Sequence, residues 1–277
     1  MGSGVMGSQI GLVAALAGFD VHIYDVKQEP FDKAQQELLK RLDRRVEKGK
    51  LTKADKDAAW ERITWTTSLD EAVGQTDYVI EAVVENVDIK RSLFEQIDGL
   101  APAHAILATN SSTIVSSKIA DATNRADKVC NFHFFNPALV MEMVEVVKGP
   151  HTSQETADLS MELAGALGKT PILLKKEISG FIANRILGKL MNEALYLYEN
   201  DYATAEEIDL ACTKALNHPI GPFALIDLTG LDIHYHVRKQ RFEESGDESD
   251  RPARIIEEKV NKGELGRKTG KGFYSYT

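Results

Sequence analysis

The sequence predicts an α/β domain with a doubly wound, mainly parallel sheet, followed by a smaller domain of helices alone. Up to about residue 175, short apolar runs rich in β-branched residues alternate with longer segments of helical periodicity. This alternation is typical of βαβ units. Beyond that point only helical patterns continue. The length of 277 residues also favours two domains.

The strands expected in the first domain are apolar on both faces, as strands are in a sheet that helices cover on both sides. They fall at residues 21–25, 78–84, 105–110, 128–135, 141–147 and 171–174. Between them the periodicity predicts helices at residues 30–50, 55–62, 89–99 and 154–168. We expect this domain to cover residues 1–178, with a helical hairpin at about residues 30–62.

The second domain is expected over residues 179–277, and its helical patterns fall at residues 181–200, 204–216, 223–241 and 252–261. The first of these segments has little polar surface. A helix this apolar, in so small a domain, favours burial against a second subunit as well as against its own domain. We therefore expect a homodimer formed through the helical domain.

The composition argues against several classes of protein. The 33 Lys and Arg against 42 Asp and Glu give a formal net charge of -9, whereas nucleic-acid-binding domains carry clustered basic residues. The two cysteines, Cys130 and Cys212, form no CxxC motif and no spacing suited to a metal, which favours a reducing compartment. No apolar run is long enough to span a bilayer. We expect a cytoplasmic protein without metal, nucleic-acid or membrane partners.

A glycine-rich turn begins the sequence and leads directly into a helical pattern. Its GxGxxG motif is Gly2-Ser3-Gly4-Val5-Met6-Gly7, of which Gly2, Gly4, Val5, Met6 and Gly7 are the candidate cofactor contacts. Glycines let the backbone approach a pyrophosphate, whose charge a helix N-terminus then stabilises. The motif alone is weak, but the next expected strand ends at Asp25, whose carboxylate would bind the ribose hydroxyls of an adenosine and repel a 2′-phosphate. The combination favours NAD over NADP, although the nearby Lys27 weakens this discrimination.

One element of the dinucleotide motif is missing from the sequence. The motif should follow a strand, yet Met1 directly precedes Gly2. Without a strand in the middle of the sheet, the backbone groups of its neighbours lose their partners and the core opens. We therefore expect a gene start assigned too late, or an altered N-terminus, rather than a protein built without this strand.

Two further patterns carry groups suited to catalysis. Residues 109–113, Thr-Asn-Ser-Ser-Thr, follow an expected strand, where ligands bind in parallel sheets; an N-cap for the next helix is an equally good interpretation. His133 ends another expected strand, and a lone histidine there is more often part of the core. Glu145 lies twelve residues later on the next strand, so neighbouring strands could bring its carboxylate to the imidazole, as general acid/base catalysis requires.

The chain resembles the L-3-hydroxyacyl-CoA dehydrogenase family, in particular its short bacterial 3-hydroxybutyryl-CoA dehydrogenases. The resemblance rests on the segments GSGVMG, VHIYD, VIEAVVEN, TNSS, HFFNP, VEVV, SGFIANR, HPIGPF and GRKTGKGFYSY, which occur in this order. It covers essentially the whole chain apart from the absent first strand. It implies a Rossmann-type first domain and an all-α dimerisation domain. Ser179 stands where the family usually has proline, which puts no catalytic role in doubt.

The resemblance also implies the roles of individual residues. His133 matches the general base, Glu145 the carboxylate that orients it, and Ser112 and Asn184 the residues that bind the substrate oxygen. The matching cofactor contacts, besides the glycine motif and Ser112, are Asp25, Glu85, Lys90, Asn136 and Lys268. Lys48 and Lys50 are candidates for the phosphates of coenzyme A, although a solvated basic face explains them as well. Glu85 and Lys90 could also form a surface pair, and Lys268 could flank a turn.

The expected activity is NAD-dependent interconversion of a short (3S)-3-hydroxyacyl-CoA, such as 3-hydroxybutyryl-CoA, and its 3-oxoacyl-CoA. Hydride would pass between C3 and the nicotinamide while His133 exchanges the hydroxyl proton. Two alternatives stay open at this point. One is a dehydrogenase of the same fold that acts on a hydroxy acid or sugar acid without coenzyme A. The other is a non-catalytic relative that keeps the scaffold.

Overall fold

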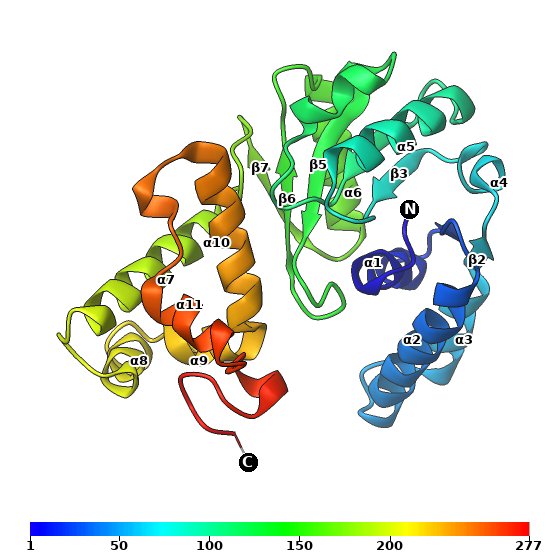
Figure 1. Ribbon diagram of the computed structural model, residues 1–277. Helices are drawn as coiled ribbons and strands as arrows, with labels where there is room; N and C mark the ends of the chain where they lie inside the picture. Colours follow the sequence, from blue (N-terminus) through cyan, green and yellow to red (C-terminus); the bar gives the residue numbers. More distant parts are fainter. Residues whose placement is uncertain (277) are drawn as a thin grey trace. The chain divides into compact units, whose positions relative to one another are not determined.

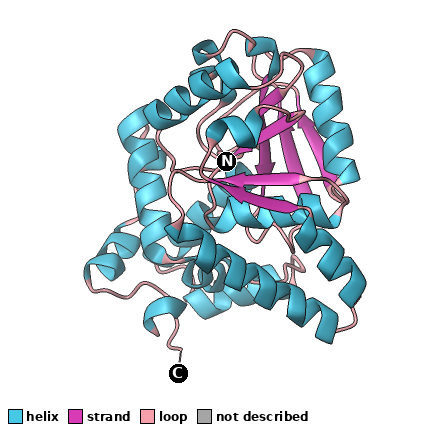
Figure 2. Cartoon of the chain, turned by 90° about the vertical axis from the view of Figure 1, so that its right-hand side faces the viewer, coloured by secondary structure: helices cyan, strands magenta, loops and turns pink. Residues whose placement is uncertain are grey.

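The computed structural model describes residues 1–276, apart from the side chains of residues 244, 245 and 249. The chain divides into two compact units, Met1–Phe181 and Ile182–Thr277 (Figure 1). All strands belong to the first unit, and the described part of the second unit contains only helices and loops (Figure 2). This arrangement confirms the predicted fold class.

The first unit alternates strands and helices along the chain. Its helices are α1 (Val5–Leu16), α2 (Glu29–Glu47), α3 (Lys53–Glu61), α4 (Leu69–Val73), α5 (Val87–Leu100) and α6 (Gln154–Ala166). Its strands are β1 (Val21–Tyr24), β2 (Ile63–Thr66), β3 (Tyr78–Glu81), β4 (Ile106–Thr109), β5 (Val129–Phe134), β6 (Met143–Val147) and β7 (Thr170–Leu174). Helices α2 and α3 form the expected hairpin, and several N-caps are the Ser, Thr and Asn side chains that helix starts favour.

The strands form two sheets. One has the order β1-β2 and the other β3-β4-β5-β6-β7, and every pair is parallel except β5 and β6. Residues 135–142 connect these two strands, and parallel pairing needs a crossover of a dozen or more residues. Strand β2 was not predicted from the sequence. It has only four residues, one of them exposed, so its hydrophobic signal is weak.

The division of the sheet lies between β1 and β3. Met1 and Gly2 occupy this place. The Met1 ammonium donates to the Ile80 carbonyl at 2.7 Å, and the Ala82 amide donates to the Met1 carbonyl at 2.8 Å. The Gly2 amide donates to the Tyr24 carbonyl at 2.8 Å. These two residues therefore hydrogen-bond to the ends of both neighbouring strands.

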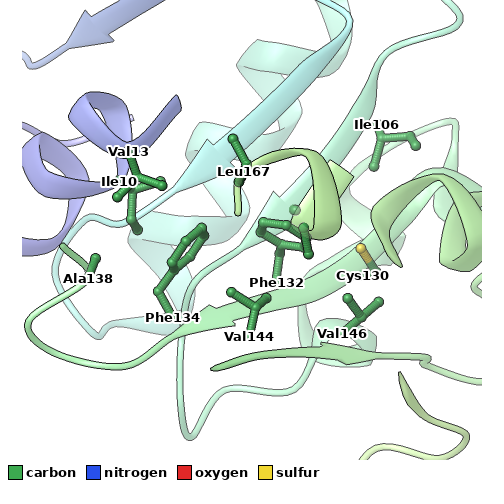
Figure 3. Packing of buried hydrophobic residues seen from close by; sticks show 12 residues of the cluster. Ile10, Val13, Ile106, Cys130, Phe132, Phe134, Ala138, Val144, Val146 and Leu167 are labelled. Carbon is green, nitrogen blue, oxygen red and sulfur yellow. The ribbon is translucent and has the colours of Figure 1, made fainter. Parts of the chain in front are cut away.

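Helices cover both faces of the larger sheet. On one face, α1 and α6 pack on β4, β5 and β6, and the buried side chains include Ile10, Phe132, Phe134, Val144 and Val146 (Figure 3). On the other face, Phe94 and Ile97 of α5 pack on Val79, Leu107 and Val129. Alternate residues of one strand thus enter different cores, which is the pattern of a strand buried on both sides.

Residues 182–276 of the second unit form five α-helices, besides two short 3-10 helices. The α-helices are α7 (Ala183–Glu199), α8 (Ala205–Lys214), α9 (Pro222–Thr229), α10 (Leu231–Ser245) and α11 (Arg254–Asn261). Their core is centred on Phe223, which contacts the rings of Tyr198 and Phe273. Within residues 1–276, no helix has the length and apolar character required to cross a membrane.

Candidate active site

The glycine turn before α1 has the backbone geometry of a phosphate-binding loop. Gly2 has a φ of +87°, and a Cβ there would lie 2.7 Å from the Ala82 carbonyl oxygen. A Cβ on Gly7 would collide with the Gly2 carbonyl, whereas one on Gly4 would meet no atom within 4 Å. Gly4 is also the N-cap of α1, and no side chain accepts a hydrogen bond from the first amides of this helix as its cap. The space beside Gly4 and the first amides of α1 therefore fit a pyrophosphate.

Asp25 follows β1 directly and lies beside this turn. Its Oδ2 accepts hydrogen bonds from the Ser3 amide at 2.8 Å and the Ser3 hydroxyl at 2.7 Å, and its Oδ1 accepts from the Val26 amide at 2.8 Å. These donors fix the carboxylate at the carboxyl end of a parallel strand. A dinucleotide bound at the turn would have its ribose in this region of such a fold.

His133 and Glu145 are brought together by the antiparallel pairing of β5 and β6, in which they are opposite residues. The imidazole Nδ1 lies 2.8 Å from Glu145 Oε2. Glu145 is fully buried and His133 is 5% exposed. An ionised carboxylate can only accept a hydrogen bond, so this contact places the proton on Nδ1 and leaves Nε2 basic. The pair can accept a proton at Nε2 and stabilise the resulting imidazolium.

The loop after β4 is tied to the strand that carries His133. The Phe134 amide donates to Asn110 Oδ1 at 2.8 Å, and Asn131 Nδ2 donates to the Ser111 carbonyl at 3.3 Å. Ser112 is half-buried, and its hydroxyl has no hydrogen-bond partner within residues 1–276. This hydroxyl is free to bind a ligand at the edge of the sheet where His133 lies.

Glu85 and Lys90 form an ion network rather than a simple surface pair. Lys90 is 1% exposed, and its ammonium lies 2.6 Å from Glu81 Oε1 and 3.3 Å from Glu85 Oε2. Glu85 is partly exposed and accepts hydrogen bonds from the Ser111 and Thr113 hydroxyls. Burial alone would raise the pKa of Glu85, but these hydrogen bonds and the Lys90 ammonium hold the pKa below its usual value.

The remaining candidate residues take part in none of the contacts described above. Asn136 is exposed just after β5, and Lys48 and Lys50 are exposed in the turn between α2 and α3. Asn184 and Lys268 belong to the second unit. Asn184 lies in the first turn of α7, and the Lys268 ammonium pairs with both carboxylate oxygens of Asp232, at 2.5 and 2.6 Å.

Sequence reasoning missed Glu81, which joins the ends of β3 and β4. It is fully buried and accepts hydrogen bonds from Thr109 Oγ1 and the Val83 amide, both at 2.7 Å, besides its pairing with Lys90. A signal was available, because a carboxylate inside an apolar strand requires a partner. Lys90, nine residues later on the next helix, could have been recognised as that partner.

Comparison with known proteins identifies both units. Residues 1–178 match the family model described as 3-hydroxyacyl-CoA dehydrogenase, NAD binding domain, and residues 180–276 match the C-terminal domain of the same family. A probable 3-hydroxybutyryl-CoA dehydrogenase of Bacillus subtilis is 41% identical over 275 residues, which are 99% of this chain and 95% of the relative. The human mitochondrial hydroxyacyl-coenzyme A dehydrogenase is 37% identical over 282 residues, covering 100% of this chain and 90% of the relative.

A solved structure shows the same fold over the whole chain. The crystal structure of (S)-3-hydroxybutyryl-CoA dehydrogenase from Ralstonia eutropha matches with a TM-score of 0.93 and 42% identity, covering 100% of this chain and 97% of that one. The chain therefore belongs to the 3-hydroxyacyl-CoA dehydrogenase family, and it is an NAD-dependent oxidoreductase that acts on 3-hydroxyacyl-CoA.

Proposed function

We propose that this enzyme interconverts (3S)-3-hydroxybutyryl-CoA and acetoacetyl-CoA. The observation that carries the chemistry is the buried His133–Glu145 pair at 2.8 Å. The choice of a four-carbon substrate is supported by the bacterial relatives of 36–41% identity that are named 3-hydroxybutyryl-CoA dehydrogenase or probable 3-hydroxybutyryl-CoA dehydrogenase.

The proposed proton transfer occurs at Nε2 of His133. In the oxidation direction Nε2 accepts the proton of the 3-hydroxyl group, while Glu145 stabilises the imidazolium that forms. NAD held by the glycine turn and Asp25 would supply the acceptor for the hydride of C3. The Ser112 hydroxyl donates a hydrogen bond to the substrate oxygen on which negative charge develops. Asn184 of the second unit is proposed to bind the same oxygen through its amide. In reduction the proton returns from Nε2 to the oxygen.

The cofactor contacts are proposed from the geometry of the turn and of the strand ends. The amides of Val5 and Met6 in the first turn of α1 bind the pyrophosphate beside Gly4, and Asp25 binds the adenosine ribose. Glu85 and Asn136 contact the nicotinamide half from the ends of β3 and β5. Lys90 is too deeply buried for a direct contact in this structure, so we assign it to the cofactor site through its ion pair with Glu85.

Two outer contacts complete the proposal. Lys48 and Lys50 lie exposed at the tip of the α2–α3 hairpin, where ammonium groups can pair with the phosphates of coenzyme A. Lys268 is proposed as a cofactor contact of the second unit, although its ammonium is already paired with Asp232.

We also propose that the second unit forms a homodimer. Its helices α7 to α10 expose large apolar side chains, among them Ile186, Leu210, Leu228, Ile233 and Val237. Exposed apolar surface of this kind marks interaction sites in soluble domains. The wide apolar coverage of the segment that forms α7 agrees with this assignment.

The proposal is tested by following NADH consumption with acetoacetyl-CoA, a longer 3-oxoacyl-CoA and free acetoacetate. We expect the highest kcat/KM with acetoacetyl-CoA and no turnover of the free acid. A higher kcat/KM with the longer thioester would contradict the four-carbon substrate. Turnover of free acetoacetate would indicate a substrate without coenzyme A, and saturable NADH binding without turnover would indicate a non-catalytic relative.

The role of His133 is tested by His133→Ala. Loss of a general acid/base lowers turnover by about 10²- to 10⁴-fold, and we expect kcat to fall by at least that factor while NADH still binds. His104→Ala is the matched control, because His104 is an exposed histidine of the same unit that pairs with Asp77. Wild-type turnover in His133→Ala would remove His133 from the mechanism.

A further inference from the structure

His133 contacts two aromatic rings in addition to Glu145. The Phe135 ring lies with its centroid 4.6 Å away at an interplanar angle of 62°, and the Phe181 ring 5.4 Å away at 60°. Phe135 is two residues along the same strand end, whereas Phe181 comes from the segment that leaves the first unit. We propose that Phe181 is a positioning residue, whose ring sets the plane of the His133 imidazole for proton transfer. This inference rests on the proposed role of His133.

The backbone of Phe181 has a conformation that aromatic residues seldom adopt. Its φ is +48°, and it follows Gly180, whose φ is +78°. Positive φ is uncommon for residues other than glycine, and it is a clear outlier for a bulky side chain. Such strain persists only where the surrounding structure fixes it, and it concentrates at functional sites. The outlier here is the residue that contacts the proposed base.

The contacts of residues 177–181 explain how this conformation is maintained. The Gly180 amide donates to the Ser112 carbonyl at 3.1 Å, and the Phe181 amide donates to the Ile178 carbonyl at 3.0 Å. The Glu177 carboxylate accepts hydrogen bonds from the Ser117 amide at 3.2 Å and from the Ser117 hydroxyl. The turn is therefore fastened at both ends to the segment that follows β4.

The side chain of Phe181 is fastened as well. It is 1% exposed and packs with Val147 and Leu174, at the ends of β6 and β7. The Phe181 ring thus contacts both the buried side chains at the ends of these strands and the His133 imidazole. The position of the Phe181 ring is consequently determined by the sheet, and it can serve as a fixed surface for His133.

A fixed ring supplies a restraint that the Glu145 hydrogen bond cannot supply alone. The hydrogen bond restrains Nδ1, but small rotations about the Cα–Cβ and Cβ–Cγ bonds of His133 can still tilt the imidazole while Nδ1 stays within hydrogen-bond distance of the carboxylate. Rotation would move Nε2 away from the substrate hydroxyl, and small misplacements of reacting groups are costly to rate. The same turn holds the backbone of Ser112 through Gly180, so it positions two groups proposed to contact one substrate oxygen.

The test compares Phe181→Leu and Phe181→Gly with Phe94→Leu. Leucine keeps apolar volume without a planar ring, and glycine removes the ring while relieving the positive φ. Phe94 is a fully buried phenylalanine of the same unit on α5, so its variant controls for a lost core ring. We expect both Phe181 variants to lower kcat by about 10- to 10²-fold, with the KM for NADH and for acetoacetyl-CoA within about twofold of wild type. Phe94→Leu should lower stability and leave kcat unchanged.

A second measurement does not depend on activity. ¹⁵N–¹H correlation spectra of histidine-labelled protein report the tautomer and the exchange broadening of each imidazole, and His133→Ala assigns the signals of His133. We expect the His133 signals to shift or broaden in both Phe181 variants and not in Phe94→Leu. Unchanged signals together with wild-type kcat in folded Phe181→Leu would overturn the inference.

The two Phe181 variants also distinguish the effect of the ring on kcat from the effect of the backbone conformation. If Phe181→Gly recovers the wild-type kcat while Phe181→Leu does not, backbone strain rather than the ring limits the site, and the inference is overturned. If His133→Ala keeps full turnover, the proposed function of His133 fails instead. In that case changes in the His133 signals of the Phe181 variants would still show that Phe181 holds the imidazole.

Discussion

Two buried carboxylates, one in each unit, are stabilised in different ways. In the first unit, Glu81 is fully buried and accepts from the Lys90 ammonium, which is itself 1% exposed. In the second unit, Asp227 is 1% exposed and accepts from three neutral donors, the Phe273 and Tyr274 amides and the Tyr276 hydroxyl, at 2.8 to 2.9 Å. One buried carboxylate is thus neutralised by a buried cation and the other is solvated by hydrogen bonds alone.

The difference follows from what lies next to each carboxylate. Lys90 also pairs with Glu85, which is partly exposed at the candidate cofactor site, so a change at Glu81 is transmitted to a group that can contact a ligand. Asp227 instead holds the C-terminal segment, and the approach is so close that a Cβ on Gly272 would collide with its carboxylate. The Lys90 ammonium therefore links the buried Glu81 to the candidate cofactor site. The neutral donors of Asp227 instead hold the C-terminal segment in place and involve no other charged group.

The largest effect should come from removing the buried cation. Lys90→Met leaves Glu81 charged, buried and without its counter-ion, and breaking a buried pair in this way costs about 3–5 kcal/mol. We expect the free energy of unfolding, measured with urea, to fall by about this amount. The KM for NADH should rise as well, because Glu85 loses the same partner.

Lys56→Met is the control for Lys90→Met. Lys56 pairs with Asp43 at 2.5 Å on the surface of the α2–α3 hairpin, where Asp43 is more than half exposed. Exposed pairs contribute about 0–1 kcal/mol, so this variant should be nearly as stable as wild type. Equal losses for the two variants would show that the burial of the Lys90–Glu81 pair has no energetic consequence.

A smaller effect is expected from a half-buried histidine of the second unit. Burial, together with the nearby Arg238 and Arg241, lowers the pKa of His234 from 6.5 to about 4. Between these values the unfolded chain binds a proton that the folded chain does not, so stability must fall as the pH falls from about 6.5 towards 4. The loss attributable to His234 is about 2 kcal/mol between pH 7.5 and pH 5.

Replacement of His234 tests this pH dependence. His234→Asn should lose less stability between pH 7.5 and pH 5 than wild type, as measured by urea unfolding at both values. His236→Asn, at an exposed position of the same helix, should keep the wild-type dependence. If His234→Asn retains the full loss, another group of the chain takes up the proton.

The fold was largely predictable because its signals are local. Apolar runs located six of the seven strands, and periodicity located most of the longer helices. The single helix expected at residues 223–241 was wrong, because the chain turns at Gly230, whose φ is +106°, and forms α9 and α10 instead. The strand at Ile63–Thr66 was not predicted because it has only four residues, of which two are buried, and so carries little hydrophobic signal. The antiparallel pairing of β5 and β6 was not predicted either, although the short connection at residues 135–142 already argues against a parallel crossover.

The sequence predicted the part of the candidate site whose residues lie on consecutive strands. The spacing of His133 and Glu145 on consecutive strands predicted a contact that the structure contains. Phe181 could not be found in this way, because its positive φ and its approach to His133 depend on how the turn packs under the sheet. The partners of Asp227 could not be found in this way either, because Phe273, Tyr274 and Tyr276 lie far from it in sequence.

The smallest effect should come from removing one neutral donor from Asp227. Tyr276→Phe deletes the hydroxyl that donates to Asp227 Oδ2 at 2.9 Å, but this oxygen still accepts from the Tyr274 amide. Hydrogen bonds to charged groups contribute about 1.5–3 kcal/mol when buried, and the remaining donor reduces the loss to about 1 kcal/mol. Urea unfolding measures it, with the exposed Tyr202→Phe as control. A loss as large as that of Lys90→Met would mean that neutral donors are as indispensable as a buried cation, and the contrast between the two units would fail.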